Sequence, residues 1–147
     1  MLRHLPGGYQ LDDDRDRLDS DAVLDFLTTE AYWHRSRSRA DIIRQIDAAW
    51  RCVGLYAPDG AQVGFARVVS DGVAFGYLAD VYVLNAHRGR GLGLALVREA
   101  VDSQPAWRWM LHTADAHTLY AKLGFRPAPD SYLERPRPEE GATEPPP

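Results

Sequence analysis

A glycine-rich loop that contains two arginines is the segment of this 147-residue chain with the clearest pattern for binding an anion. The loop, Arg88-Gly-Arg-Gly-Leu-Gly93, follows an apolar run and leads into Leu94-Ala-Leu-Val-Arg-Glu-Ala-Val101, which has helical spacing. Glycines let the backbone bend and approach a ligand closely. The first amides of a helix are unpaired and favour phosphate, and the guanidinium groups of Arg88 and Arg90 suit phosphate oxygens. The loop is therefore predicted to bind a phosphate group.

Two common phosphate-binding patterns do not fit this loop. The nucleotide-binding pattern that ends in Gly-Lys-Ser/Thr needs a lysine and a hydroxyl residue, and residues 88–93 contain neither. The dinucleotide spacing Gly-x-Gly-x-x-Gly fails because the glycines fall at 89, 91 and 93. The pattern Arg-x-x-Gly-x-Gly after an apolar strand fits, and it resembles the pyrophosphate-binding motif of the GNAT superfamily of acyl-CoA-dependent N-acetyltransferases. The alternative is an ordinary strand-loop-helix connection whose glycines serve tight packing.

A second segment strengthens the resemblance. Residues 112–125 contain Leu119-Tyr-Ala-Lys-Leu-Gly-Phe125, which is similar to the family's late segment, where a helix carrying Leu-Tyr-x-Lys-x-Gly-Phe follows the fifth strand. The two signatures cover the second half of the chain in the family's order. In the first half, Ala31-Tyr-Trp33 and Gly64-Phe-Ala-Arg67 resemble one bacterial subgroup of GNAT proteins without an assigned acceptor.

The resemblance implies an N-acetyltransferase that moves an acetyl group from acetyl-CoA to a primary amine, by direct attack in a ternary complex. Backbone groups of one strand would pair with the pantetheine arm, and one of these amides would donate to the thioester oxygen. Asp115 could touch the pantetheine or could instead cap the following helix. The implied cofactor-binding residues are Val81, Tyr82, Val83, Arg88, Gly89, Arg90, Gly91, Leu92, Gly93 and Asp115.

Two residues are predicted to be catalytic. Tyr120 matches the family's tyrosine near the cofactor sulfur, where a phenol could protonate the departing thiolate; the alternative is helix packing. Asp80 lies on the cofactor strand, where a carboxylate could bind an ammonium group or accept its proton through water. Some relatives carry two adjacent acidic residues at this point, but Ala79 precedes Asp80 in this chain. The alternative for Asp80 is a hydrogen bond to a neighbouring loop.

The acceptor is predicted to contact the segment 32–39, where family members form one wall of the pocket, together with Asp80. Tyr32 and Trp33 could pack against the apolar part of an amine, and Arg35 or Arg37 could meet a carboxylate. Core aromatics followed by a solvated basic loop are the alternative. If the arginines face the pocket, an amino-acid-like acceptor is favoured over a polyamine.

The resemblance implies a small-molecule or peptide amine as the partner, and composition argues against other classes. The net charge is −4 and no long basic run occurs, so nucleic-acid binding is not expected. Cys52 is the single cysteine and no metal-ligand spacing is present, so neither a disulfide nor a metal site is expected. No signal pattern or membrane-spanning run appears, which predicts a cytoplasmic protein that does not bind membranes. A homodimer is expected from the small domain size alone.

The pattern of elements predicts one α/β domain over residues 1–134 and a disordered tail over 135–147, which is rich in proline and glutamate. The expected order is β-α-α-β-β-β-α-β-α-β, a mixed, largely antiparallel sheet with helices on both faces, as in the GNAT fold. The expected strands are 8–11, 52–56, 63–69, 74–83, 107–113 and a last one from Phe125, and the expected helices are 19–33, 38–49, 93–101 and 116–122.

A non-catalytic acyl-CoA-binding or interaction module is the alternative to an enzyme. The presence of Tyr120 argues against it, whereas the missing acidic residue at Ala79 argues for it. Turnover distinguishes the two, and affinity for acetyl-CoA alone does not.

Overall fold

Six strands form one mixed sheet in the computed structural model, which describes residues 1–31, 37–136 and 138. The strand order is β1-β2-β3-β4-β5-β6, and every neighbouring pair is antiparallel except β5 and β6, which are parallel. The expected largely antiparallel α/β fold is confirmed. In chain order the elements are β1 (Leu2–His4), β2 (Gln10–Asp12), α1 (Ser20–Thr29), α2 (Arg39–Ala48), β3 (Arg51–Tyr56), β4 (Gln62–Ser70), β5 (Phe75–Val83), α3 (Leu92–Asp102), β6 (Arg108–Leu111) and α4 (His117–Ala121).

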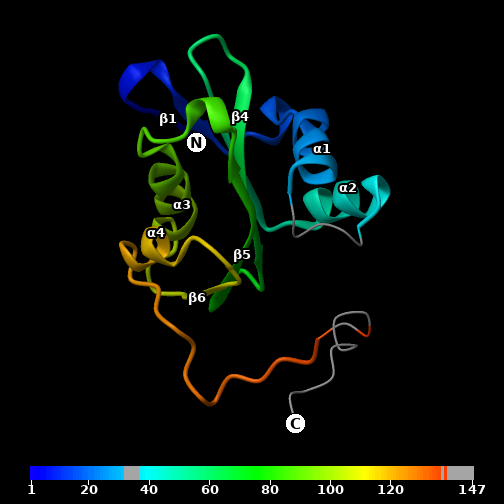
Figure 1. The fold of residues 1–147 in the computed structure, drawn as a ribbon, viewed down its shortest axis with the longest axis vertical. Helices are drawn as coiled ribbons and strands as arrows, with labels where there is room; N and C mark the ends of the chain where they lie inside the picture. The colour runs from blue at the N-terminus through cyan, green and yellow to red at the C-terminus, as the bar shows by residue number, and fades with distance from the viewer. Residues whose placement is uncertain (32–36, 137, 139–147) are drawn as a thin grey trace.

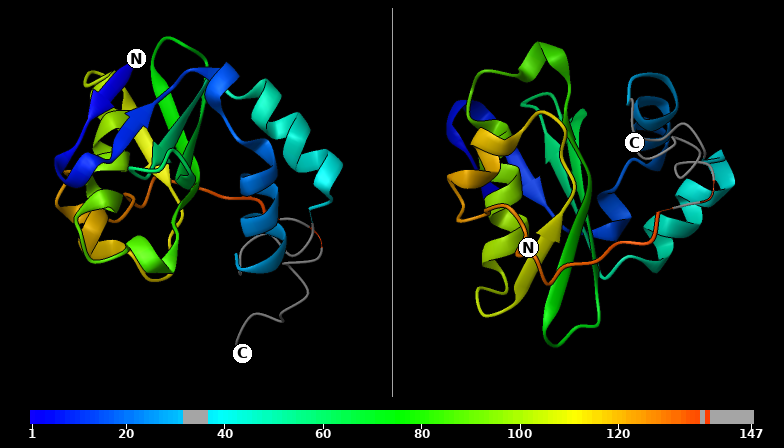
Figure 2. Two further views of the ribbon diagram at one scale, coloured as in Figure 1. Left: turned by 90° about the horizontal axis from the view of Figure 1, so that it is seen from above. Right: turned by 60° about the horizontal axis from the view of Figure 1, so that its bottom comes forward.

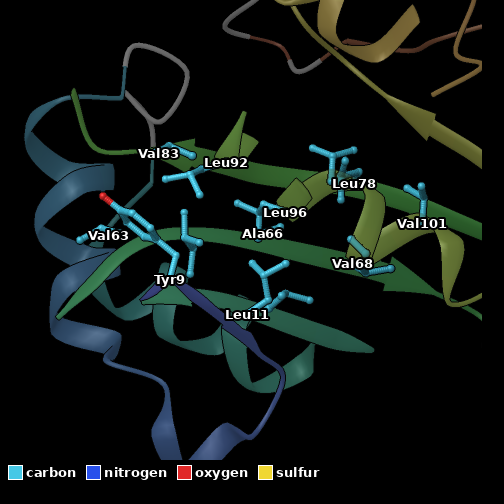
Figure 3. Packing of buried hydrophobic residues seen from close by; sticks show 14 of the residues in the cluster. Tyr9, Leu11, Val63, Ala66, Val68, Leu78, Val83, Leu92, Leu96 and Val101 are labelled. Atoms are coloured by element: carbon cyan, nitrogen blue, oxygen red, sulfur yellow. The ribbon is translucent and has the colours of Figure 1, made fainter. Parts of the chain in front are cut away.

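Helices cover both faces of the sheet, with α3 and α4 on one side and α1 and α2 on the other (Figures 1 and 2). Successive strand residues point to opposite faces, so each face has its own apolar cluster. On β4, Ala66 and Val68 belong to the cluster under α3, whereas Phe65 belongs to the cluster under α1 and α2. Figure 3 shows the first cluster, in which Leu92 and Leu96 of α3 lie against the strands.

The helices of the α1–α2 layer begin where polar side chains satisfy their first amides. Asp19 accepts a hydrogen bond from the Ala22 amide at the start of α1. Ser38 accepts one from the Asp41 amide at the start of α2, as the sequence predicts. Helix α1 ends at Thr29, earlier than the predicted end near residue 33.

The chain begins with a hairpin where one strand was predicted. Strands β1 and β2 pair antiparallel, with Arg3 opposite Leu11. All three residues of β1 are exposed, so the strand lacks the alternation of apolar and polar residues that would reveal it in a sequence. Leu11 of β2 is buried and was part of the predicted strand.

The predicted last strand from Phe125 does not form: residues 125–136 contain no strand. Pro127 and Pro129 lack the amide hydrogens that a strand ladder needs, which explains the error. The segment instead runs past the end of the sheet from the α4 side to the α2 side (Figures 1 and 2). The predicted disordered tail, residues 135–147, lies almost wholly outside the described residues.

Candidate active site

Strand β6 pairs with only the first half of β5, and the two strands then separate. Their pairing ends at Leu78 opposite Leu111, whereas β5 continues to Val83. The Leu84 amide donates to Val63 of β4 at 2.8 Å. Because backbone groups alternate along a strand, the amides of Val83 and Val81 point the other way, toward the edge that β6 has left. A ligand that lies along this edge could therefore pair with both amides.

A β-bulge lies beside this opening. Phe65 pairs with Tyr82 but Arg67 pairs with Ala79, so Asp80 and its neighbour Val81 both stand opposite one residue of β4. Asp80 has φ of +53°, a left-handed conformation found at no other non-glycine residue of the described chain. Such a backbone costs on the order of 1–3 kcal/mol and persists only where surrounding contacts hold it.

Two arginines supply those contacts. The carboxylate of Asp80 accepts hydrogen bonds from Arg37 Nη1 at 3.0 Å, Arg37 Nη2 at 2.8 Å and Arg67 Nε at 2.8 Å. The side chains of all three residues are at least nine-tenths buried. Arg37 precedes α2 and Arg67 lies on β4, so the carboxylate joins three separate parts of the chain.

These contacts argue against the predicted role of Asp80 as a proton acceptor. Burial raises the pKa of Asp80, but the hydrogen bonds from Arg37 and the charge of Arg67 outweigh it and hold the pKa below its usual value. Three of the carboxylate's four lone-pair positions are already used. The carboxylate is therefore a weak base that is bound to two cations.

The glycine loop begins α3 with an unusual backbone. Gly89 and Gly91 have φ of +77° and +74°, and Gly91 is the N-cap of α3. A Cβ atom at either position would meet no atom within 4 Å, so the left-handed backbone and not crowding requires glycine. Gly93 has no left-handed backbone, and its Cβ would make an ordinary 3.4 Å contact with Leu119 of α4. The open side of the loop at Gly89 and Gly91 has room for a ligand.

Two contacts anchor the start of the loop. Arg88 Nε donates to the carbonyl oxygen of Val83 at 2.8 Å, which leaves its terminal nitrogens for a ligand. The preceding His87 forms a 2.8 Å hydrogen bond through Nδ1 with the hydroxyl of Tyr9. A hollow of about 640 Å³ beside the loop is lined by Phe26, Glu30, Leu84, Asn85, Ala86 and Arg88.

Tyr120 lies on α4 within the cluster under α3. Its ring makes an edge-on contact with Phe125, with 5.6 Å between the ring centres. It also lines a hollow of about 1120 Å³ between β6, α4 and residues 126–133.

Asp115 does not cap α4, so the prediction that it could cap this helix is wrong. The N-cap residue is Ala116, whose amide donates to the hydroxyl of Thr113 at 3.0 Å. Asp115 is exposed and makes no capping bond, so its carboxylate stays accessible.

Of the predicted acceptor-binding residues, Tyr32, Trp33 and Arg35 lie outside the described residues. Arg37, the other arginine considered for a carboxylate, is bound to Asp80. The sequence analysis assigned no role to Arg67. Its burial was predictable, because side chains alternate between the faces of a strand and Arg67 therefore shares the buried face of Phe65. A buried arginine needs an anionic partner, and Asp80 is the only acidic residue on the next strand.

Cys52 is not placed for nucleophilic chemistry. It is buried in the α1–α2 cluster, and burial raises the pKa of its thiol to about 11.

Among residues 1–31, 37–136 and 138, no group of three or more His, Cys, Asp and Glu side chains could hold a metal ion. No helix in these parts of the chain has the length and apolar character needed to span a membrane.

Comparison with known proteins identifies the family. Residues 49–127 match the model of the acetyltransferase (GNAT) domain. FG08082 of Gibberella zeae, a candidate acetyltransferase, is 32% identical over 142 residues, which cover 82% of this chain and 80% of that protein. A crystal structure of a candidate GNAT-family acetyltransferase from Xanthomonas campestris pv. campestris has 40% identity and a TM-score of 0.79, and the match covers 92% of this chain and 97% of that one.

The chain therefore belongs to the GNAT family of acetyltransferases. It is an enzyme of the acyltransferase class, as its two sequence signatures predict. Glucosamine-6-phosphate N-acetyltransferase of Arabidopsis thaliana also matches, with a TM-score of 0.60 over 86% of this chain and 97% of that chain. Its identity to this chain is 14%, so that likeness concerns the fold alone.

Proposed function

We propose that this acetyltransferase moves an acetyl group from acetyl-CoA to a primary amine, and that the amine attacks the thioester directly in a ternary complex. The observation that carries the proposal is the parting of β5 and β6 after Leu78, beside the glycine loop that begins α3. An opened strand edge next to a helix N-terminus suits a donor with an amide-rich arm and a pyrophosphate.

The donor would lie along the open edge of β5. The pantetheine arm would pair with backbone groups of Val81–Val83, and the pyrophosphate would accept bonds from the amides of residues 88–93 and from Arg88 and Arg90. The Val83 carbonyl already accepts a bond from Arg88, so the contact with Val83 would use its amide. The exposed carboxylate of Asp115 is proposed to touch the arm.

The chemical step would use one backbone amide and one phenol. The amide of Val81, beside the bulge, is proposed to donate to the thioester oxygen as negative charge develops on it. Tyr120 is proposed to protonate the thiolate of CoA as the carbon–sulfur bond breaks. The proton that the amine loses would pass to water, since the bound carboxylate of Asp80 is a weak base.

Two-substrate kinetics test the ternary complex. Initial rates measured at several concentrations of acetyl-CoA and of an amine should give intersecting double-reciprocal lines. Parallel lines, or acetylated protein after incubation with acetyl-CoA alone, would indicate a covalent intermediate and contradict the proposal.

A conservative variant tests Tyr120. Tyr120→Phe should lower kcat by about 100-fold or more, the usual contribution of a general acid, while the Kd for acetyl-CoA stays within about twofold. Tyr56→Phe is the matched control. Tyr56 lies on β3, two strands from β5, and its hydroxyl donates to the carbonyl oxygen of Arg17. Equal kcat values for the wild type and Tyr120→Phe would remove Tyr120 as the acid.

A cytoplasmic location and a homodimer stay predictions.

A further inference from the structure

We infer that the acceptor is an amine that also carries an anionic group, and that the guanidinium group of Arg67, beside that of Arg37, binds this group on the α1–α2 face of the sheet. The inference rests on the proposed function, because it names the acceptor class for the proposed amine acetylation. Three observations support it: the net charge of the buried cluster, the free nitrogens of Arg67 and the position of the cluster on β5.

The buried cluster has an excess of positive charge. It contains two guanidinium groups and one carboxylate, that of Asp80, and the remaining partner of Arg37 is the neutral oxygen of Gln45 at 2.8 Å. Across the described parts of the chain, Asp80 is the only carboxylate bonded to either arginine. A buried charge is unfavourable without a partner of opposite sign, and an anionic ligand would supply one.

Two of the three guanidinium nitrogens of Arg67 are available as hydrogen-bond donors. Its Nε bonds Asp80, and across the described parts of the chain its two terminal nitrogens have no hydrogen-bond partner. Neither nitrogen is among the fully enclosed side-chain atoms without a hydrogen-bond partner in these parts of the chain. The Arg67 side chain is 9% exposed, and its terminal nitrogens are not fully enclosed. Two terminal nitrogens in a planar fork match the oxygens of a carboxylate or a phosphate.

The cluster lies where an acceptor would approach. Both faces of β5 carry packed apolar side chains, Leu78 and Val83 under α3 and Tyr82 under α1 and α2. The charged cluster interrupts the apolar packing on the α1–α2 face, and this is where we place the acceptor. Arg67 stands opposite Ala79, which precedes Val81 by two residues on β5. The proposed anion site and the proposed oxyanion donor therefore lie at neighbouring positions of β5.

Matched pairs of acceptors test the inference. CoA thiol release would be measured with glycine, phenylalanine, glutamate and lysine, each beside its carboxamide, and with O-phosphoethanolamine beside ethanolamine. Each pair is compared at equal concentration of unprotonated amine. The anionic member of at least one pair should have the higher kcat/KM, by about tenfold to a hundredfold. The carboxylate and phosphate pairs then show which anion the site prefers.

Arginine variants connect the preference to the cluster. Arg67→Gln should reduce the ratio of kcat/KM between the anionic and neutral members of the preferred pair toward one, and Arg67→Lys should keep part of it. Arg44→Gln on the outer face of α2, where the side chain is 81% exposed, is the control and should keep the full ratio. This ratio does not depend on the fraction of folded enzyme, so a destabilised variant still gives a result.

The possible failures are distinguishable. Turnover of neutral amines as fast as that of their anionic partners would overturn this inference and leave the proposed function standing. An anion preference that Arg67→Gln leaves intact would also overturn it. No thiol release with any acceptor would contradict the inference and the proposed function together.

Discussion

Replacing Asp80 by asparagine removes the one negative charge of the buried cluster. Asp80→Asn keeps the size of the side chain but leaves Arg37 and Arg67 buried without an anion. Removing one partner of a buried ion pair costs about 3–5 kcal/mol, and this carboxylate accepts three charged hydrogen bonds. For a domain of this length that loss corresponds to a decrease in Tm on the order of 10 °C.

The loss should depend on pH in a definite direction. The pKa of Asp80 is lower in the folded protein than in the unfolded chain, so its stabilisation is fully present above about pH 4. That stabilisation disappears as the pH falls through the folded-state pKa, because the protonated carboxyl resembles an asparagine amide in charge. The difference in unfolding free energy between the wild type and Asp80→Asn should therefore be constant from pH 5 to 7 and shrink below about pH 4.

Urea unfolding followed by tryptophan fluorescence at several pH values measures this difference. Asp25→Asn on α1 is the matched control, because the Asp25 side chain is 78% exposed and its ion pair with Arg39 is 3.9 Å long. The control should change the unfolding free energy by about 0.5 kcal/mol or less. The reasoning is refuted if Asp80→Asn matches the wild type at pH 7, or if its deficit is the same at pH 3 as at pH 7.

Three further variants or reagents test other parts of the structure. Arg88→Gln should weaken acetyl-CoA binding about tenfold or more in calorimetry, because it removes a charged donor at the loop; an unchanged Kd would contradict the proposed phosphate contact. Gly76→Ala should destabilise the fold by about 1–3 kcal/mol in urea, because the new Cβ would lie 2.4 Å from the Trp109 ring; wild-type stability would mean that the ring moves freely. Cys52, with its thiol pKa raised by burial to about 11, should react with a thiol reagent at pH 8 only after unfolding, and rapid reaction of the native protein would contradict its burial.

The parts that could be predicted from the sequence are those with local causes. The strand, loop and helix around residues 75–102 follow from period, glycine chemistry and helix-end electrostatics within one short segment. The start of α2 at Ser38 was predictable for the same reason, because the capping partner Asp41 is three residues away.

The parts that could not be predicted depend on contacts between distant residues. Arg37 and Asp80 are 43 positions apart, and nothing local marks them as partners. The bulge at Asp80 depends on how β4 and β5 align, which a one-residue shift would change. The error at residues 125–136 was avoidable, since Pro127 and Pro129 already argue against a strand.

The most direct test of the proposed reaction is CoA thiol release from acetyl-CoA with a panel of amines, followed by mass spectrometry of the products. The panel would contain polyamines, amino acids, aminoglycosides and peptide termini. The proposed function predicts thiol release that requires an amine, with one acetyl group added to that amine. Binding of acetyl-CoA without release for any amine would contradict the catalytic role, and absence of binding would contradict the proposed donor site at residues 88–93.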